Sequence, residues 1–400
     1  MTKKTYPKIY LAIDNCFASK RWTKPEEWMK FTKELGIYHV EASADNECDP
    51  LYTTPGYLKK WGDEIINASS KTGVKVSNLY SGHGTYSTLG LAHTDKSVQE
   101  NMKNNWLKVM IDMASNMEAG LGFFTHAFNQ ATLLDKEKYQ QALNELVENF
   151  IELANYANGK KIKSIGVEQM YTPHQIPWTV NGALDLLQQI NREANRPFYL
   201  TIDVGHQSGQ HKFLLPEFGH LKEKLRLWRD QGHMDGLWLG PEKAYKIFHK
   251  ALKTSGEKEN QLINEILEEA RTNPHLFASG EDGDPYYWLE KLGCYSPIIH
   301  LQQTDGKSSA HKPFTPEWNE KGIIDAGKIL KALKCSCDMP RDNNMPKACD
   351  DIYLTIEVFS ATADIPADIR RRLELTSQYW RRYIPRDGET LDKLIEHCNR

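Results

Sequence analysis

The chain has 400 residues, of which 40% are hydrophobic and 26% charged, and its 50 basic and 53 acidic residues give a formal net charge of −3 at pH 7. This composition is typical of a folded protein with a large core, and it lacks the positive charge expected of a protein that binds a nucleic-acid backbone. No stretch approaches the roughly 18 apolar residues of a membrane span, and no small-residue cleavage site follows the short apolar run near the N-terminus. We therefore expect a cytoplasmic protein without a nucleic-acid or membrane partner.

Short β-rich segments alternate with longer amphipathic ones. The expected strands are Ile9–Asp14, Tyr38–Ala42, Val74–Tyr80, Leu121–His126, Ile162–Glu168, Pro197–Asp203, Ser296–Gln302 and Ile352–Phe359. The expected helices between and after them are Lys24–Leu35, Pro55–Ser70, Ser97–Glu118, Lys136–Asn158, Asn181–Ala194 and Asp364–Tyr383. This alternation predicts an α/β protein in which parallel strands close into a (β/α)8 TIM barrel. An open doubly wound sheet is the alternative, but no G-x-G-x-x-G motif follows any strand.

One connection is much longer than a crossover requires. Residues 204–295 separate the sixth and seventh strands and contain two further predicted helices, Pro241–Lys253 and Glu257–Thr272. We expect residues 1–400 to form a single barrel domain with a helical insertion at about residues 207–292. Because the insertion begins on the catalytic side of the barrel, it is predicted to be a lid or a subunit contact. A homo-oligomer is therefore one possible assembly. A second extension, residues 335–350, is rich in Cys, Asp, Asn, Met and Pro and is predicted to be a surface loop on the opposite face.

Charged or imidazole side chains stand at the ends of four successive strands. Glu168, Asp203, His300 and Glu357 are each flanked by apolar β-forming residues, where an isolated charge is costly. The carboxyl ends of the strands meet at one rim of a barrel, so the four side chains could converge on one divalent cation. Three carboxylates and one imidazole suit Mn²⁺ first, with Mg²⁺, Co²⁺ and Zn²⁺ as alternatives. For any one of them alone, an ordinary salt bridge or hydrogen bond is the alternative.

This order of residues resembles the xylose-isomerase-like, or AP-endonuclease-2, superfamily of sugar phosphate isomerases and epimerases. The resemblance covers nearly the whole barrel, and the four strand ends are its specific part. It implies that Glu168, Asp203, His300 and Glu357 bind the metal and that Glu168 and Glu357 also act as the catalytic acid and base. His206, the last residue of Asp-x-x-His, matches a substrate-contacting position. The epimerases carry an arginine shortly after the seventh-strand histidine, whereas this chain has Leu-Gln-Gln-Thr-Asp-Gly-Lys there.

Further substrate contacts are predicted on the same rim. Three candidates end or follow early strands, and two lie in the polar loop after the seventh strand, where barrels often bind phosphate. They are Glu41, His83 and His126, and Lys307 and His311. The alternative for the first three is an ordinary loop or core residue, and for the last two a solvated loop that closes over the site.

The predicted function is a metal-dependent isomerase or epimerase of a sugar or sugar phosphate, in particular a ketose. The cation acidifies a C–H next to a carbonyl, and a glutamate removes the proton to give a metal-stabilised enediolate. The alternative is a metal-dependent lyase of the inosose-dehydratase kind, acting on a polyol-derived ketone. An apurinic endonuclease is disfavoured by the negative net charge and the mononuclear ligand set, and a non-catalytic sugar-binding barrel by the two intact glutamates. The sugar, its phosphorylation, the metal and the glutamate roles are left open.

Overall fold

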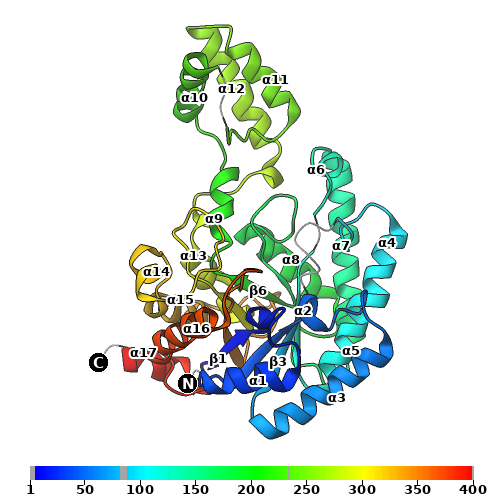
Figure 1. Ribbon diagram of the computed structural model, residues 1–400. Coiled ribbons are helices and arrows are strands. Elements are labelled where there is room, and N and C mark those ends of the chain that lie inside the picture. Colours follow the sequence, from blue (N-terminus) through cyan, green and yellow to red (C-terminus); the bar gives the residue numbers. More distant parts are fainter. Residues whose placement is uncertain (1–4, 82–87, 126, 233–234, 399–400) are drawn as a thin grey trace.

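The computed structural model describes residues 5–81, 88–125, 127–232 and 235–398, and its central element is a closed barrel (Figure 1). The eight barrel strands are β1 (Lys8–Asp14), β2 (His39–Ser43), β3 (Lys75–Ser81), β4 (Gly120–Phe123), β5 (Ile165–Glu168), β6 (Tyr199–Asp203), β7 (Ile298–Leu301) and β8 (Asp351–Ile356). Each strand pairs in parallel with the next one in the chain, and β1 pairs with both β8 and β2. This closure confirms the predicted barrel and excludes the open sheet. A short strand, β9 (Glu389–Thr390), lies antiparallel to β1.

Helices form the outer layer around this barrel (Figure 1). The longer ones are α1 (Pro25–Glu34), α3 (Pro55–Thr72), α5 (Lys108–Asn116), α7 (Lys136–Ala157), α8 (Val180–Glu193), α13 (Pro285–Leu292), α15 (Ala326–Asp338), α16 (Pro366–Arg381) and α17 (Leu391–Cys398). The shorter ones are α2 (Ala44–Glu47), α4 (Lys96–Asn101), α6 (Gln130–Leu133), α9 (Gln207–Gln210) and α14 (Pro316–Lys321). A π-helical segment, Met102–Leu107, joins α4 to α5. Among the described residues, no helix is both long and apolar enough to cross a bilayer.

Local sequence signals set the ends of these helices, as α3 illustrates. The Thr54 side chain accepts a hydrogen bond from the backbone N–H of Tyr57, and Pro55 occupies the first turn, where its missing N–H costs nothing. Gly73 ends the helix with a φ of 78°, a left-handed conformation that glycine adopts without strain. Trp61 is 1% exposed on the inner face of α3, so burial of that face adds to the stability that the caps provide.

Aromatic side chains join the helical layer to the strands. Phe150 of α7 stacks on Phe198, just before β6, with ring centroids 5.3 Å apart, and Phe123 of β4 packs against both rings. All three side chains are fully buried. Large buried rings of this kind contribute much of the apolar area that stabilises the barrel, and they hold the strand ends in place.

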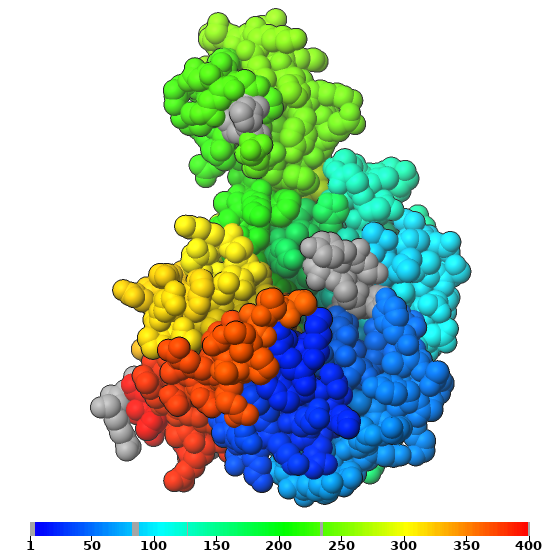
Figure 2. All heavy atoms as spheres, viewed as in Figure 1, coloured from blue at the N-terminus to red at the C-terminus, as the bar shows by residue number. Residues whose placement is uncertain are grey.

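The long connection between β6 and β7 contains a separate group of three helices, α10 (Phe218–Gln231), α11 (Glu242–Ala251) and α12 (Glu257–Arg271). These helices pack around a small hydrophobic cluster of their own, and they project from the barrel (Figures 1 and 2). Helices α11 and α12 were predicted, but α10 was not. Only Leu221 and Leu225 of its fourteen residues are buried, so its apolar periodicity is weak.

The predicted loop at residues 335–350 is wrong in its first part. Helix α15 continues to Asp338, so Cys335 and Cys337 are helical, and Cys337 is buried. Its inner face carries Ile329, Leu330 and Leu333. Packing of this face against the barrel keeps the chain helical up to Asp338, although the composition of the last residues alone favours a loop.

Candidate metal centre and active site

Four side chains from successive strand ends lie together in the barrel. Glu168 is the last residue of β5, Asp203 is the last of β6, His300 lies in β7, and Glu357 follows the last residue of β8. Asp203 is in register with His300, and the backbone N–H of Glu357 donates to the carbonyl of Leu301 at 3.0 Å. The exposed fractions of the four residues are 3%, 0%, 0% and 6% in chain order. The structure therefore brings together all four residues that the sequence predicts as metal ligands.

His300 lies between carboxylates on both sides of its ring. Its Nε2 is 2.5 Å from Oε1 of Glu41, and its Nδ1 is 3.0 Å from Oε1 of Glu168 and 3.5 Å from Oε2 of Glu357. Burial by itself lowers the pKa of His300, but these three glutamates outweigh it and hold the pKa well above 6.5. This raised pKa describes the ring among its carboxylates alone, because a cation bound at Nδ1 would displace the proton from that nitrogen.

The two glutamates that contact His300 most closely are held at their other oxygens as well. Tyr80 of β3 donates its hydroxyl hydrogen to Oε2 of Glu168, and the side-chain amide of Asn78 donates to Oε2 of Glu41 at 2.5 Å. Sequence reasoning places Glu41 on the substrate rim, but Glu41 is fully buried and both of its oxygens are engaged. Glu41 is therefore placed to orient His300, in the way that carboxylates orient metal-binding histidines in many proteins.

Asp203 is surrounded by hydrogen-bond donors. Its Oδ1 accepts from the backbone N–H groups of Gly205 at 2.6 Å and His206 at 3.2 Å. The side-chain amide of Gln302 donates to both carboxylate oxygens, at 2.8 and 2.9 Å. Burial raises the pKa of Asp203, but the three neighbouring histidines outweigh it and hold the pKa well below its ordinary value. Asp203 therefore stays ionised, as a metal ligand must.

Sequence reasoning missed Gln302, although a signal for it exists. Side chains two apart on a strand point to the same face, so Gln302 follows His300 into the barrel. Gln302 is fully buried, and a polar side chain in that position requires partners. Tyr80 was missed for a related reason, because its apolar ring fits the pattern of a core residue.

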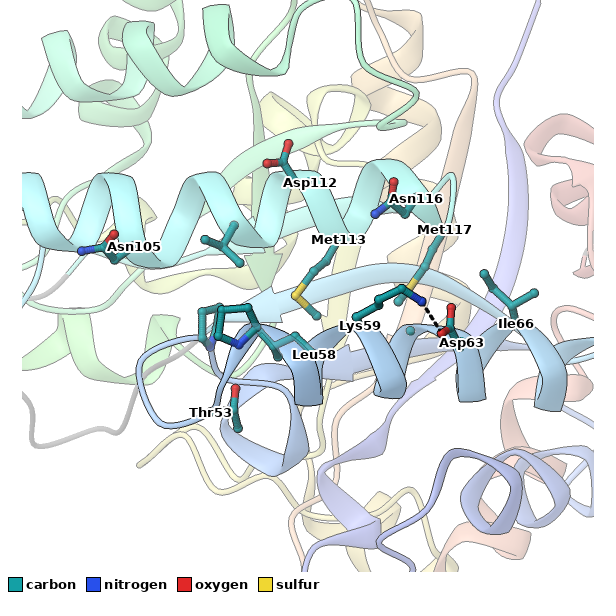
Figure 3. A pocket seen from close by; sticks show the side chains of 14 residues that line it. Thr53, Leu58, Lys59, Asp63, Ile66, Asn105, Asp112, Met113, Asn116 and Met117 are labelled. Carbon is teal, nitrogen blue, oxygen red and sulfur yellow. Dashed lines mark hydrogen bonds and ion pairs between the residues drawn. The ribbon is translucent and has the colours of Figure 1, made fainter.

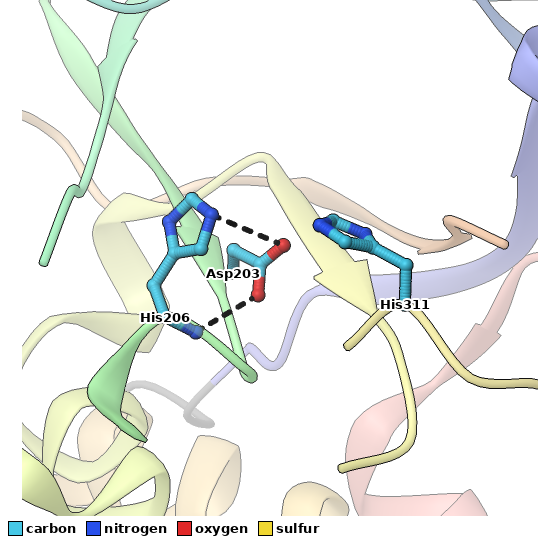
Figure 4. A group of neighbouring side chains, drawn as sticks. All are labelled: Asp203, His206 and His311. Atoms are coloured by element: carbon cyan, nitrogen blue, oxygen red, sulfur yellow. Dashed lines mark hydrogen bonds and ion pairs between the residues drawn. The ribbon is translucent and has the colours of Figure 1, made fainter. Parts of the chain in front are cut away.

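Two further histidines flank Asp203, as Figure 4 shows. His206 Nδ1 lies 2.8 Å from the carbonyl of Gln169, and its Nε2 lies 3.8 Å from Oδ2 of Asp203. His311 Nδ1 lies 3.3 Å from Oε2 of Glu357. Burial lowers the pKa of His311, but nearby carboxylates, first that of Glu357, outweigh it and raise the pKa to about 9. The candidates His206 and His311 therefore do join the cluster.

Lys307 does not join the cluster. The Lys307 side chain is 87% exposed, with Asp305 as a neighbour at 4.0 Å, so it points to solvent rather than into the barrel. His83 and His126 lie outside the described residues. The loop after β7 thus presents His311, and not its lysine, to the strand ends.

The donor atoms of the cluster fit a divalent cation. Two groups of three residues each offer one ligand atom within 4.8 Å of the others: Glu168, Asp203 and His300, and Asp203, His206 and His311. Among the described residues, Oε2 of Glu357 makes no hydrogen bond, and the imidazoles of His311 and His300 lie 3.3 and 3.5 Å from it. A buried carboxylate oxygen without a hydrogen bond leaves a position that a ligand can complete. Carboxylates with imidazoles are the donors that Mn²⁺ and similar ions take.

A separate hollow lies on the outer wall of the barrel. It is a groove of about 660 Å³ between α3 and α5, lined by apolar side chains such as Leu58, Ile66, Met113 and Met117 (Figure 3). The polar groups that line it are the amides Asn105 and Asn116 and the carboxylates Asp63 and Asp112, and Asp63 is paired with Lys59 at 2.7 Å. The groove contains none of the strand-end residues, so it is separate from the candidate metal centre.

A parallel barrel with buried carboxylates and imidazoles at the carboxyl ends of its strands defines a protein whose active site is formed by those strand ends. The family model described as xylose isomerase-like TIM barrel matches residues 29–234, slightly more than half of the 400 residues. The chain therefore belongs to the xylose isomerase-like TIM barrel family.

Solved structures with this architecture cover nearly the whole chain. One, from Rhodospirillum rubrum and provisionally assigned as a xylose isomerase, is 17% identical, with a TM-score of 0.66 over 93% of this chain and 98% of the other. An L-ribulose 3-epimerase is 12% identical, with a TM-score of 0.51 over 98% and 97% of the two chains. At these identities the likeness shows the fold alone.

A short segment is more closely related to a characterised enzyme. It is 42% identical over 56 residues to the D-erythrulose 1-phosphate 3-epimerase of Brucella abortus. The alignment spans 14% of this chain and 18% of that relative, less than a fifth of its length.

Proposed function

We propose that the protein is a divalent-metal-dependent isomerase or epimerase of a ketose or ketose phosphate. The observation that carries this proposal is the pair of buried glutamates, Glu168 and Glu357, whose carboxylates both approach Nδ1 of His300, at 3.0 and 3.5 Å. Two carboxylates beside a cation-binding donor set are the groups that proton transfer next to a carbonyl requires.

A divalent cation bound by Glu168, Asp203, His300 and Glu357 would polarise the carbonyl and an adjacent hydroxyl of the substrate. Oε2 of Glu357 makes no hydrogen bond among the described residues, and burial raises the pKa of this carboxyl, so it is suited to accept the proton from the neighbouring carbon. Glu168 lies against His300 and Tyr80, and it is placed to return to the substrate a proton that it first takes from one of these two donors. Return to the same carbon from the other face inverts it, whereas return to the adjacent carbon interconverts ketose and aldose.

The substrate class is proposed from the neighbours of the site and from the relatives. The Brucella relative acts on a phosphorylated four-carbon ketose, and His206 and His311 offer this site imidazole donors for hydroxyl or phosphate oxygens. We further propose Mn²⁺ as the cation, because the ligands are carboxylates and imidazoles. We also propose that the protein is cytoplasmic. The α10–α12 helices are proposed either to join copies of the chain into a homo-oligomer or to close over the site.

Deuterium exchange tests this function directly. Purified protein with Mn²⁺ in D₂O would be mixed with D-erythrulose 1-phosphate and then with a panel of other ketoses and ketose phosphates, and followed by proton NMR. We expect deuterium at the carbon next to the carbonyl together with the epimer or the aldose. Loss of water without epimer would indicate the lyase instead, and no exchange with any substrate would refute the proposal.

Two variants connect the exchange to the proposed residues. Glu357→Gln and Glu168→Gln should each reduce exchange by at least about a hundredfold, because each removes a proton-transfer group. Glu47→Gln is the matched control, since Glu47 is also a partly buried glutamate but contacts Trp28 and Asn15 instead. Exchange that survives in Glu357→Gln would contradict the proposed role.

A further inference from the structure

Gln302 makes hydrogen bonds to two parts of the site, the carboxylate of Asp203 and the backbone of His311. Its Nε2 donates to both oxygens of Asp203, at 2.8 and 2.9 Å, and its Oε1 accepts from the backbone N–H of His311 at 2.6 Å. Gln302 is fully buried. Hydrogen bonds to an ionised carboxylate are stronger than hydrogen bonds between neutral groups. The position of the Gln302 amide and the position of the Asp203 carboxylate therefore depend on each other.

The surroundings are shaped around this side chain. A Cβ on Gly205 would lie 2.3 Å from Cδ of Gln302, so the absence of a side chain at residue 205 makes room for the amide. The closeness leaves the amide little freedom to rotate. The partners fix which atom faces Asp203, because the carboxylate only accepts and the N–H of His311 only donates.

His311 is held in a conformation that requires support. Its φ is 45°, in the left-handed region that side-chain-bearing residues rarely adopt. Its ring stacks on Phe359 with centroids 3.9 Å apart and planes 12° apart. Two backbone hydrogen bonds between Gln303 and Lys312, of 2.8 and 3.1 Å, close the loop that carries it. The hydrogen bond from its N–H to Gln302 sets the backbone of this residue, while Ser309 and Glu357, each 3.3 Å from a ring nitrogen, contact the imidazole.

We infer that Gln302 is a positioning residue that couples cation binding at Asp203 to ketose binding at His311, an inference that rests on the proposed function. A ketose that contacts the His311 ring shifts or stabilises the loop, and the loop transmits this through the Gln302 amide to the Asp203 carboxylate. By thermodynamic linkage, the cation must then tighten ketose binding by the same factor by which the ketose tightens cation binding.

The coupling can be measured without relying on turnover. The dissociation constant of Mn²⁺ would be determined by titration with and without saturating D-erythrulose 1-phosphate, for the wild type and for Gln302→Met. Methionine is similar in length but neither donates nor accepts these hydrogen bonds. We expect the ketose to tighten Mn²⁺ binding at least about fivefold in the wild type. In Gln302→Met, Mn²⁺ should bind about 10- to 100-fold more weakly, and the ketose effect should shrink at least about threefold, to the part that direct contact between ketose and cation supplies.

The adjacent residue provides a matched control. Gln303 is also fully buried, and its side-chain amide donates to Asn319 at 3.0 Å and to the carbonyl of Ile324 at 2.9 Å, away from Asp203. Gln303→Met should therefore keep the coupling, even if it lowers the melting temperature. If Gln302→Met does not fold, Gln302→Asn, which is too short to reach both partners, replaces it.

The outcomes separate this inference from the proposed function. Equal coupling in the wild type and the Gln302 variant, or none in the wild type, overturns the role of Gln302 while deuterium exchange can still occur. Loss of coupling in both the Gln302 and the Gln303 variants also overturns it, because the effect is then not specific. Absence of exchange with every ketose refutes the proposed function, whatever the Mn²⁺ titrations show.

Discussion

Glu41→Gln is the substitution that best tests how the buried part of the site works. Oε1 of Glu41 lies 2.5 Å from Nε2 of His300, and the other oxygen accepts from Asn78. The substitution keeps the size of the side chain but removes one of the three carboxylates whose charge holds His300 in place. His300 then loses a charged hydrogen-bond partner on the side of the ring that faces away from Glu168 and Glu357.

The expected loss is large enough to measure. Removal of a carboxylate that orients a metal-binding histidine typically weakens metal binding 10- to 100-fold, which is about 1.4–2.7 kcal/mol. Because Glu41 is fully buried, solvent does not replace the lost partner. We therefore expect the dissociation constant of Mn²⁺ in Glu41→Gln to rise by about that factor, measured by competition with a fluorescent chelator. The rate of deuterium exchange at subsaturating Mn²⁺ should fall in parallel and should recover at high Mn²⁺.

The competing interpretation makes a different prediction. If Glu41 binds substrate on the rim, as its sequence position suggests, Glu41→Gln raises the KM for the ketose and leaves Mn²⁺ affinity unchanged. Glu47→Gln serves as the control for a lost glutamate charge in the same part of the chain, and it should leave both constants unchanged. Unchanged Mn²⁺ affinity in Glu41→Gln, with a raised KM, would refute the orienting role.

Three further predictions concern stability and the loop. Burial raises the pKa of Glu47 from 4.5 to about 7, so the folded protein should lose about 3 kcal/mol of unfolding free energy between pH 4.5 and 7. Urea titrations at several pH values should show that Glu47→Gln abolishes this decline. An unchanged dependence of the unfolding free energy on pH in this variant would contradict the prediction. Gly205→Ala should destabilise the protein by about 1–3 kcal/mol, because the Cβ of the alanine would overlap the side chain of Gln302. A melting temperature of this variant equal to that of the wild type would show that the site relaxes without cost. Lys307→Ala should leave the KM for ketose phosphates within about twofold, whereas a tenfold rise would show that Lys307 reaches the substrate.

The barrel and its four strand-end residues could be predicted because both depend on local patterns. Buried parallel strands are short apolar runs, and a Glu, Asp or His inside or just after such a run stands out. The chain order then places these residues next to each other, since each strand pairs with the following one. Strand β8 ends at Ile356 rather than at the predicted Phe359, yet Glu357 still reaches the cluster, because one residue beyond a strand end remains on the same rim.

The other contacts depend on depth and on loop path, which sequence periodicity does not record. The alternation of side chains along a strand distinguishes the inside of the barrel from the outside, but it does not distinguish a residue at the rim from one a layer below. Glu41 therefore has the sequence pattern of a substrate contact, whereas its surroundings are those of a residue that orients His300. The loop after β7 offers two basic candidates, and only the tertiary path, with Gln302 and Phe359 around it, turns His311 inward and leaves Lys307 in solvent. Specificity in such a site is therefore decided by contacts between strand ends and loops, and a change at Gln302 should alter both cation and substrate binding without touching any predicted ligand.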